Sequence, residues 1–200
     1  MEEKKTSFTN PKDFDYQERK VKSKTIFKGR VVTLKKDEAI TTSGKTVYRE
    51  YVKHHGGVCI LAVNDEGKIA IVQQFRYPVG NSVLELPAGK LEQDENPREG
   101  AIRELEEEIG YRTRDLLELG SIYPCVGYSS EIIYLFLARD LIKTQTHFDD
   151  DEYIKLNWFS VEELRWMLEN NMFLDGKTIV LLYKYFDMLN SQSYLDQDLD

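Results

Sequence analysis

Apolar and polar positions alternate along the chain in two different periods, and they predict strands interleaved with helices. Residues 58–63 form an unbroken apolar run, which predicts a central strand buried on both faces. Residues 64–67 have the composition of a hairpin turn, so the chain is expected to return as a strand over 68–76. Further short strands are predicted at 83–86, 116–123, 132–138 and 154–159.

Three segments carry the period of a helix instead. The first begins at Asn96, a good N-cap, with Glu99 at the capping-box position. Gly110 supplies its end, because glycine readily adopts the left-handed conformation that stops a helix. Two further helices are predicted over 160–170 and 175–189. Strands mixed with helices predict an α/β (α+β) protein.

The chain divides by composition into four parts. Residues 1–20 are polar and predict a flexible arm, and 190–200 predict a polar tail. Residues 21–55 predict a small antiparallel β subdomain, and 56–189 the main domain. The subdomain strands are expected at 25–27, 31–34 and 46–52. A sheet of this size is marginal alone, so it must pack on something, and a partner subunit is one candidate.

Charge and cysteine usage narrow the class of protein. The formal net charge of the 200 residues is −8, which argues against nucleic-acid binding because that needs a basic surface. Cys59 and Cys125 form no metal-ligand pattern and are expected to be small buried hydrophobes in a reducing compartment. No apolar run is long enough for a membrane span or a signal region. A soluble, cytoplasmic protein without a membrane partner is expected.

The first helix carries a dense group of carboxylates. Glu104, Glu107 and Glu108 share one helical face, where like charges repel. Carboxylate oxygens are ligands for hard divalent cations such as Mg²⁺ or Mn²⁺, which would relieve that repulsion. A solvated acidic face is the alternative interpretation, since acidic runs usually have that role.

The spacing around this helix favours the metal site. Gly89 is followed after five residues by Glu95, and after seven more by Arg103 and Glu104. After two intervening residues come Glu107 and Glu108, and after one more come Gly110 and Tyr111. This arrangement resembles the signature of the Nudix hydrolases, with Tyr111 where the family often has an aliphatic residue. The resemblance covers about residues 57–189. It implies a Nudix α/β/α sandwich with a mixed central sheet, which hydrolyses a nucleoside diphosphate linked to another group.

The resemblance also implies roles for the residues of the motif. Glu104, Glu107 and Glu108 would hold Mg²⁺ or Mn²⁺, and the backbone carbonyl of Ala88 would complete the metal's ligands. Arg103 would orient the glutamates through charge-assisted hydrogen bonds. Gly89 would permit the tight loop, and Glu95 would brace that loop against the helix.

Flanking segments resemble one branch of the family, the ADP-ribose and nucleotide-sugar pyrophosphatases. The matching runs are residues 73–78 and 84–90, and the N-terminal pattern of Gly44 and Lys45 followed by Arg49 and Glu50. In that branch the N-terminal sheet is commonly exchanged across a homodimer, which would give the small sheet its packing partner.

By the same resemblance, Arg76 would contact the substrate diphosphate from its own subunit. Arg49 and Glu50 would reach the substrate from the partner subunit. Each has a plainer interpretation: Arg76 as a surface arginine at a strand end, and Arg49 and Glu50 as outward charges of a strand.

Two loops complete the expected site. Val126 stands where ADP-ribose hydrolases usually carry a proline, so the resemblance leaves the nucleotide sugar open. Glu131 would help to line the site. In the acidic run over 149–152, Glu152 is the first candidate and Asp150 the second for the carboxylate that assists the attacking water. An acidic turn is the alternative for this run. Trp158 and Trp166 are expected to pack in the core or against a helix.

The leading hypothesis is a metal-dependent pyrophosphatase of ADP-ribose or a related nucleotide sugar. Within the enzyme class, the alternative is a Nudix hydrolase of a dinucleoside polyphosphate or a nucleoside triphosphate. From another class, the alternative is a non-catalytic sensor of nucleotide sugars. Such sensors usually lose motif glutamates or add a DNA-binding region, and the sequence shows neither.

Overall fold

The computed structural model describes residues 16–146 and 153–197, with side chains of the last helix described up to Ser191. The described chain separates into two compact units. The first consists of the residues up to Lys53 together with Gly127–Ser129, and the second of the remainder.

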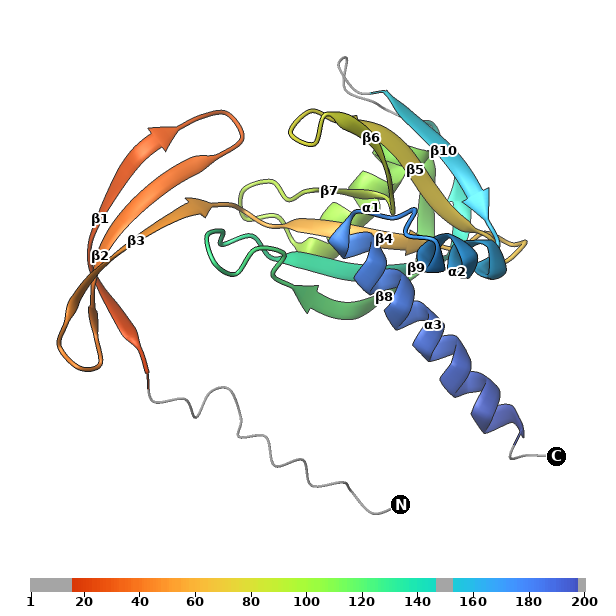
Figure 1. The fold of residues 1–200 in the computed structure, drawn as a ribbon. Coiled ribbons are helices and arrows are strands. Elements are labelled where there is room, and N and C mark those ends of the chain that lie inside the picture. The colour runs from red at the N-terminus through yellow and green to blue at the C-terminus, as the bar shows by residue number, and fades with distance from the viewer. Residues whose placement is uncertain (1–15, 147–152, 198–200) are drawn as a thin grey trace. The chain divides into compact units, whose positions relative to one another are not determined.

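The first unit is an antiparallel sheet in the order β1-β2-β3 (Figure 1). Its strands are β1 (Glu18–Lys28), β2 (Thr33–Thr41) and β3 (Thr46–Lys53). The predicted strands at 25–27 and 31–34 were too short, and β1 begins inside the segment predicted as an arm. Nearly every residue of β1 is exposed. A strand that buries neither face needs no apolar alternation, so its sequence carries little strand signal.

The second unit contains two sheets with three helices. A mixed sheet has the order β7-β4-β9-β8, in which β4 and β9 run parallel, and an antiparallel sheet has the order β10-β5-β6. The strands of the mixed sheet are β4 (Gly57–Ala62), β7 (Ala88–Lys90), β8 (Tyr111–Ile122) and β9 (Ile133–Lys143). Those of the antiparallel sheet are β5 (Ile69–Arg76), β6 (Asn81–Glu85) and β10 (Ile154–Phe159). The helices are α1 (Pro97–Ile109), α2 (Val161–Glu169) and α3 (Gly176–Gln197).

The central strand β4 is buried on both faces, as its apolar run predicts. Cys59 and Leu61 point into a core cluster that includes residues of α2 and α3. Val58 and Ile60 point into a second cluster that includes residues of α1. Because successive strand residues face opposite sides, one strand supplies both cores. The expected α/β/α arrangement with a mixed sheet is confirmed.

The predicted turn at 64–67 is present, but the two strands that flank it do not remain paired. Asn64 accepts hydrogen bonds from the N–H groups of Glu66 and Lys68 at 3.0 and 2.9 Å. After a single bridge between Val63 and Ile69, β4 continues in the mixed sheet and β5 in the antiparallel one. The turn therefore connects the two sheets of the second unit.

The helix ends follow their capping residues. Asn96 accepts a hydrogen bond from Arg98 N–H, and Gly110 ends α1 in the left-handed conformation with φ 72°. Helix α3 continues to Gln197, well beyond the predicted end at 189. The polar residues after 189 lose the apolar stripe without a glycine or proline that would break the helix, so periodicity alone placed the end too early.

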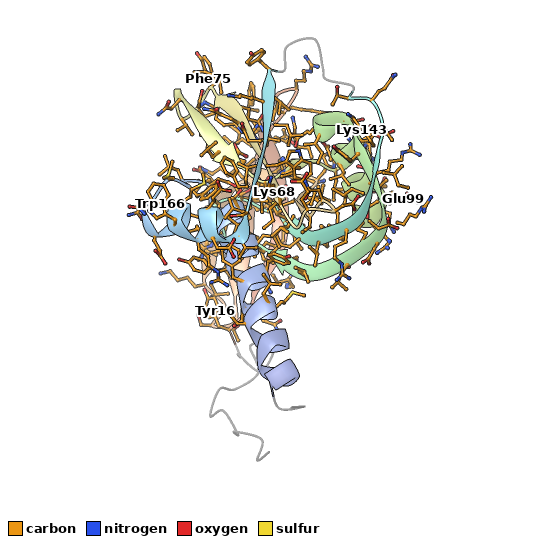
Figure 2. The ribbon with its side chains drawn as sticks, turned by 90° about the vertical axis from the view of Figure 1, so that its right-hand side faces the viewer. Tyr16, Lys68, Phe75, Glu99, Lys143 and Trp166 are labelled. Carbon is orange, nitrogen blue, oxygen red and sulfur yellow. The ribbon has the colours of Figure 1, made fainter. Side chains whose placement is uncertain are left out.

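The two tryptophans, Trp158 and Trp166, differ in burial. Trp158 is partly buried and meets Tyr111 edge to face, with ring centroids 5.7 Å apart. Trp166 lies on the outer side of α2 (Figure 2) and is 58 % exposed, so its predicted packing role was wrong. No helix of the described chain is long and apolar enough to cross a bilayer.

Candidate active site

The three motif glutamates lie on α1 at the boundary between core and surface. Glu104 and Glu108 are only 9 % and 6 % exposed, whereas Glu107 is half-buried. Helix α1 packs its apolar stripe on the mixed sheet, which presses these carboxylates against β7. The N–H of Ala88, the first residue of β7, donates a hydrogen bond of 2.9 Å to Glu108 Oε2.

Arg103 is the centre of this cluster. Its Nη1 donates to Glu104 Oε1 at 2.9 Å and to Glu107 Oε2 at 2.8 Å. Its Nε and Nη2 donate to the two carboxylate oxygens of Glu95 at 2.9 and 3.0 Å, and Nη2 also reaches the carbonyl of Lys90. The hydrogen bond from Arg103 lowers the pKa of Glu95, and the surrounding carboxylates, Glu95 first, raise the pKa of Arg103.

The loop before α1 is fixed by the same contacts. Glu95 Oε2 accepts the backbone N–H of Glu92 at 2.8 Å while it holds Arg103, so loop and helix are joined through one carboxylate. Gly89 is required for a different reason: a Cβ at this position would lie 1.9 Å from Glu104 Cδ. Only glycine allows β7 to approach the glutamate so closely.

The donors of this cluster suit a hard divalent cation in kind. They are carboxylate and carbonyl oxygens, and three glutamates contact the one arginine while Glu108 contacts Ala88, so negative charges outnumber positive ones. Among the described residues, no three acidic, histidine or cysteine side chains are already gathered around one metal position. Glu104 and Glu107 are turned onto Arg103, and a bound cation would compete with that arginine for them.

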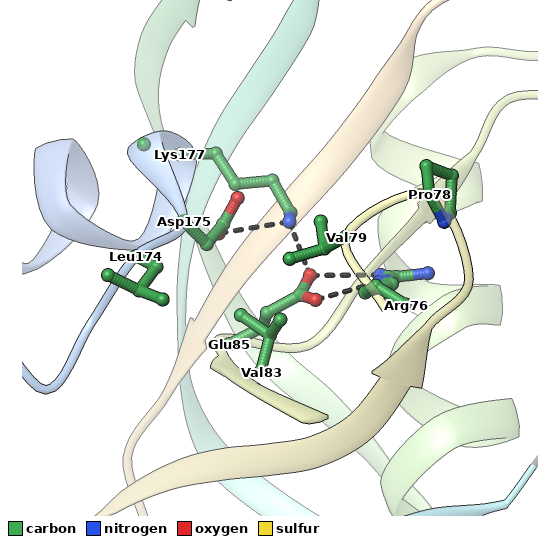
Figure 3. Close-up of a pocket in the computed structure, with 9 residues that line it drawn as sticks. Arg76, Pro78, Val79, Val83, Glu85, Leu174, Asp175 and Lys177 are labelled. Atoms are coloured by element: carbon green, nitrogen blue, oxygen red, sulfur yellow. Dashed lines mark hydrogen bonds and ion pairs between the residues drawn. The ribbon is translucent and has the colours of Figure 1, made fainter. Parts of the chain in front are cut away.

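A second cluster of charges lies around Arg76 and Glu85 (Figure 3). Glu85 has a side chain only 3 % exposed, and it accepts two hydrogen bonds from Arg76, at 2.7 and 2.9 Å. Lys177 Nζ donates to Glu85 Oε2 at 2.6 Å and lies 3.0 Å from Asp175 Oδ2. The four groups form a line of alternating charge, Arg76–Glu85–Lys177–Asp175, which we call the charge ladder. They border a cavity of about 370 Å³.

The pairing in the ladder overcomes the cost of burial. Burial alone would raise the pKa of Glu85, but Arg76 and Lys177 hold it below its usual value. Burial alone would lower the pKa of Lys177, but Asp175 and Glu85 raise it. Glu85 and Lys177 therefore both stay charged at neutral pH despite their burial.

The ladder and the α1 cluster are close enough to interact. The pKa of Arg76 is raised first by its hydrogen bond to Glu85, and the negative charge of Glu108 adds to the effect. The backbone also joins them, because Glu85 ends β6 and Ala88 begins β7 only three residues later.

Arg76 was predicted from the sequence as a site residue. The sequence did not predict that Glu85, Asp175 and Lys177 belong to the same arrangement. A signal for Glu85 existed, because it is a carboxylate between apolar neighbours in a short strand. Lys177 gave a weaker signal, as a charge at the start of an apolar helix.

The remaining predicted residues that the structure describes have the following contacts. Glu131 Oε1 lies 3.6 Å from His54 Nδ1, which itself accepts the N–H of Gly56. Arg49 and Glu50 belong to β3 in the first unit, where Arg49 pairs with Glu18 and Glu50 with Lys36. Asp150 and Glu152 lie outside the described residues.

Comparison with known proteins identifies the family to which the residues of this site belong. Residues 53–181, more than half of the chain, match the family model described as "NUDIX domain". The chain belongs to this family, which confirms the resemblance seen in its motif. Members of the family generally use divalent metal ions.

Two curated relatives extend over most of the chain. An "ADP-ribose pyrophosphatase" of Bacillus subtilis is 38 % identical over 81 % of this chain and 89 % of its own length. A "Methanol dehydrogenase activator" of Bacillus methanolicus is 38 % identical over 82 % of this chain and 90 % of its own. A solved structure, "Crystal structure of ADP compounds hydrolase", shares the fold with a TM-score of 0.76 and 19 % identity, over 88 % of this chain and 96 % of that one.

Proposed function

We propose that the protein is a Mg²⁺- or Mn²⁺-dependent pyrophosphohydrolase of nucleoside diphosphate sugars, with ADP-ribose as its first candidate substrate. The products would be a nucleoside monophosphate and a sugar phosphate. The observation that carries the proposal is the Arg103 cluster, in which Glu95, Glu104 and Glu107 of the motif are hydrogen-bonded to one arginine. The relative named "ADP-ribose pyrophosphatase" supports this choice of substrate.

The residues of α1 and β7 would hold the metal and its substrate. Glu104, Glu107 and Glu108 would act as ligands together with the carbonyl of Ala88, and Arg103 would fix the orientation of their carboxylates. When bound, the divalent ion supplies neutralisation of the diphosphate charge and activation of a water molecule. The Ala88 N–H already holds the Glu108 carboxylate in place through Oε2.

Arg76 would bind the diphosphate. Glu85 engages Nε and Nη2 of its guanidinium, so the Nη1 corner is the part that points away from Glu85. The side chain is 40 % exposed and borders the cavity, which gives a phosphate oxygen access to that corner. A carboxylate in the 149–152 run, Glu152 before Asp150, would assist the attacking water, and Glu131 would line the site.

A homodimer would complete the site. The first unit exposes large apolar side chains, among them Val21, Ile26, Phe27 and Tyr48, which a partner subunit would cover. Arg49 and Glu50 would then reach the partner's substrate. Cys59, which is buried, and Cys125, which is partly buried, are not in disulfides, which suits the reducing cytoplasm.

A substrate panel tests the proposal. ADP-ribose, GDP-mannose and UDP-glucose would be supplied with Mg²⁺ or Mn²⁺, and the products identified by chromatography. Turnover should occur and should be lost in Glu108→Gln. The matched control is Glu106→Gln, on the same helix, where Glu106 pairs only with Arg112 among the contacts described. Tight binding of these compounds without turnover would favour a sensor, and full activity of Glu108→Gln would refute the assigned site.

Light scattering tests the dimer separately. A dimer at micromolar concentration is expected, and a monomer would remove the roles given to Arg49 and Glu50.

A further inference from the structure

We propose that Lys177, at the start of α3, is a positioning residue that holds Glu85 and, through it, the diphosphate-binding guanidinium of Arg76. This inference rests on the proposed function, because it assigns a role for one of that site's residues. The juxtaposition that carries it joins the end of β6 to the first turn of α3, two segments far apart in the chain.

The geometry around Glu85 makes Lys177 and Arg76 depend on each other. Glu85 Oε2 accepts from both Arg76 Nη2, at 2.9 Å, and Lys177 Nζ, at 2.6 Å. Glu85 Oε1 accepts from Arg76 Nε at 2.7 Å. A buried carboxylate fixed by two cations at once has one orientation, and this orientation determines where the planar guanidinium must lie.

Lys177 is itself held by the N-terminal turn of α3. Asp175 Oδ2 lies 3.0 Å from Lys177 Nζ, and it accepts both the N–H and the hydroxyl of Thr178, at 3.0 and 2.6 Å. The Lys177 side chain is only 14 % exposed, so its ammonium group has little freedom to move to water.

The same turn also supports the strand end that leads to Ala88. Thr178 is fully buried, and its Oγ1 accepts the N–H of Leu86 at 2.9 Å. Two residues further on, Ala88 N–H donates to Glu108. The segment from Glu85 to Ala88 is therefore fastened to α3 at one end and to α1 at the other.

The charge balance shows why Lys177 is assigned to positioning. The ladder contains two cations and two carboxylates, and Lys177 lies between the two carboxylates (Figure 3). Its charge is thus matched inside the ladder. Arg76 stands at the end of the ladder, with an acidic partner on one side only, and its side chain is the more exposed of the two cations.

The experiment is a double-mutant cycle on the full chain, with steady-state kinetics on whichever nucleotide sugar of the panel is turned over best. Lys177→Met should raise KM about tenfold and change kcat much less, since loss of a supporting partner costs on the order of 10- to 100-fold. Lys177→Arg should restore most of the loss because the cation is kept. In an Arg76→Ala background, Lys177→Met should add almost nothing, because its target is already absent.

The control is Lys184→Met, which removes an exposed lysine from the same helix and should leave both constants unchanged. Wild-type activity with an unchanged KM in folded Lys177→Met would overturn the inference while leaving the proposed function intact. Equal losses in both backgrounds would overturn it too, since Lys177 would then act independently of Arg76. Absence of turnover by the wild type would instead refute the proposed function.

A second variant covers the case in which Lys177→Met does not fold. Asp175→Asn keeps an oxygen for Thr178 but removes the charge beside Lys177, so it should raise KM in the same direction by a smaller factor. An unchanged KM in folded Asp175→Asn, or an equal increase with Arg76 absent, would contradict the role of this turn.

Discussion

The Arg103 cluster and the charge ladder have central residues of opposite charge. In the cluster, one arginine stands among Glu95, Glu104 and Glu107; in the ladder, one glutamate stands between Arg76 and Lys177. The cluster has an excess of negative charge, whereas the ladder is balanced. The negative excess of the cluster favours binding of a cation. In the ladder each charge is matched by a neighbour, so the interactions fix the positions of the groups themselves.

The residues at the centres of the two regions differ in burial. The side chain of Arg103 is 29 % exposed, while that of Glu85 is 3 % exposed. Water can therefore stabilise Arg103 when a partner is lost, but it has little access to Glu85. Removal of the Glu85 charge should therefore lower stability as well as disturb Arg76, whereas substitutions in the cluster should act mainly on catalysis.

The largest effect is expected for Glu85→Gln. Removal of the buried charge leaves Arg76 and Lys177 facing each other without the carboxylate between them, which should cost about 3 kcal/mol of unfolding free energy at pH 7. Urea unfolding measures it. A loss below about 1 kcal/mol would show that the ladder is solvated and would remove the contrast between the two regions.

The effect of Glu85→Gln on the unfolding free energy should depend on pH. The pKa of Glu85 is lowered from its ordinary value of 4.5 in the folded protein, by Arg76 and Lys177 against the effect of burial. Its contribution to stability is thus complete above pH 4.5 and is lost as the pH falls through the lowered folded value. The stability difference between wild type and Glu85→Gln should be constant from pH 7 to pH 5 and should shrink at lower pH.

Glu108→Gln should give the next largest effect, on catalysis alone. Loss of a carboxylate proposed as a metal ligand should reduce kcat/KM by more than about 100-fold, since supporting residues alone cost up to that amount. The amide oxygen can still accept Ala88 N–H, so the melting temperature should stay close to that of the wild type. A drop in stability comparable with that of Glu85→Gln would make Glu108 a structural residue like Glu85.

Arg103→Lys should have an intermediate effect. A lysine keeps the charge but cannot hold Glu95, Glu104 and Glu107 together, because it lacks the guanidinium fork. Activity should fall on the order of 10- to 100-fold, with a higher metal concentration needed for half-maximal rate. A metal titration followed by initial rates checks this. An unchanged metal concentration at half-maximal rate would show that Arg103 does not support the proposed metal ligands.

The smallest effect is expected for the stability of Glu107→Gln. Relief of repulsion on α1 opposes the weakening of one half-exposed contact to Arg103, so the unfolding free energy should stay within about 0.5 kcal/mol of the wild type. Urea unfolding beside Glu85→Gln gives the direct comparison of the two regions. A loss above about 1 kcal/mol would show that the cluster also serves stability.

How much of this could be predicted depended on the distance along the chain between the interacting residues. The helix α1, its caps and the grouping of Glu104, Glu107 and Glu108 follow from local spacing, since residues three and four apart share a helical face. The buried strand β4 follows from its apolar run. The end of α3 and the start of β1 were misplaced because both segments are polar, so burial left no pattern in them.

By itself, the sequence determined the family, the helix that carries the motif glutamates and the layers that pack on the central strand. These depend on periodicity and on a motif contained within about one turn-and-helix unit. Only the tertiary structure decided that Arg76 is held by Glu85 and that Glu85 is held by Lys177, 92 residues further along the chain. No spacing rule connects a strand end to the first turn of a distant helix. That contact exists because the core on the α3 side of β4 also includes Leu84 and Leu86, the neighbours of Glu85, and a buried carboxylate needs cationic partners close in space.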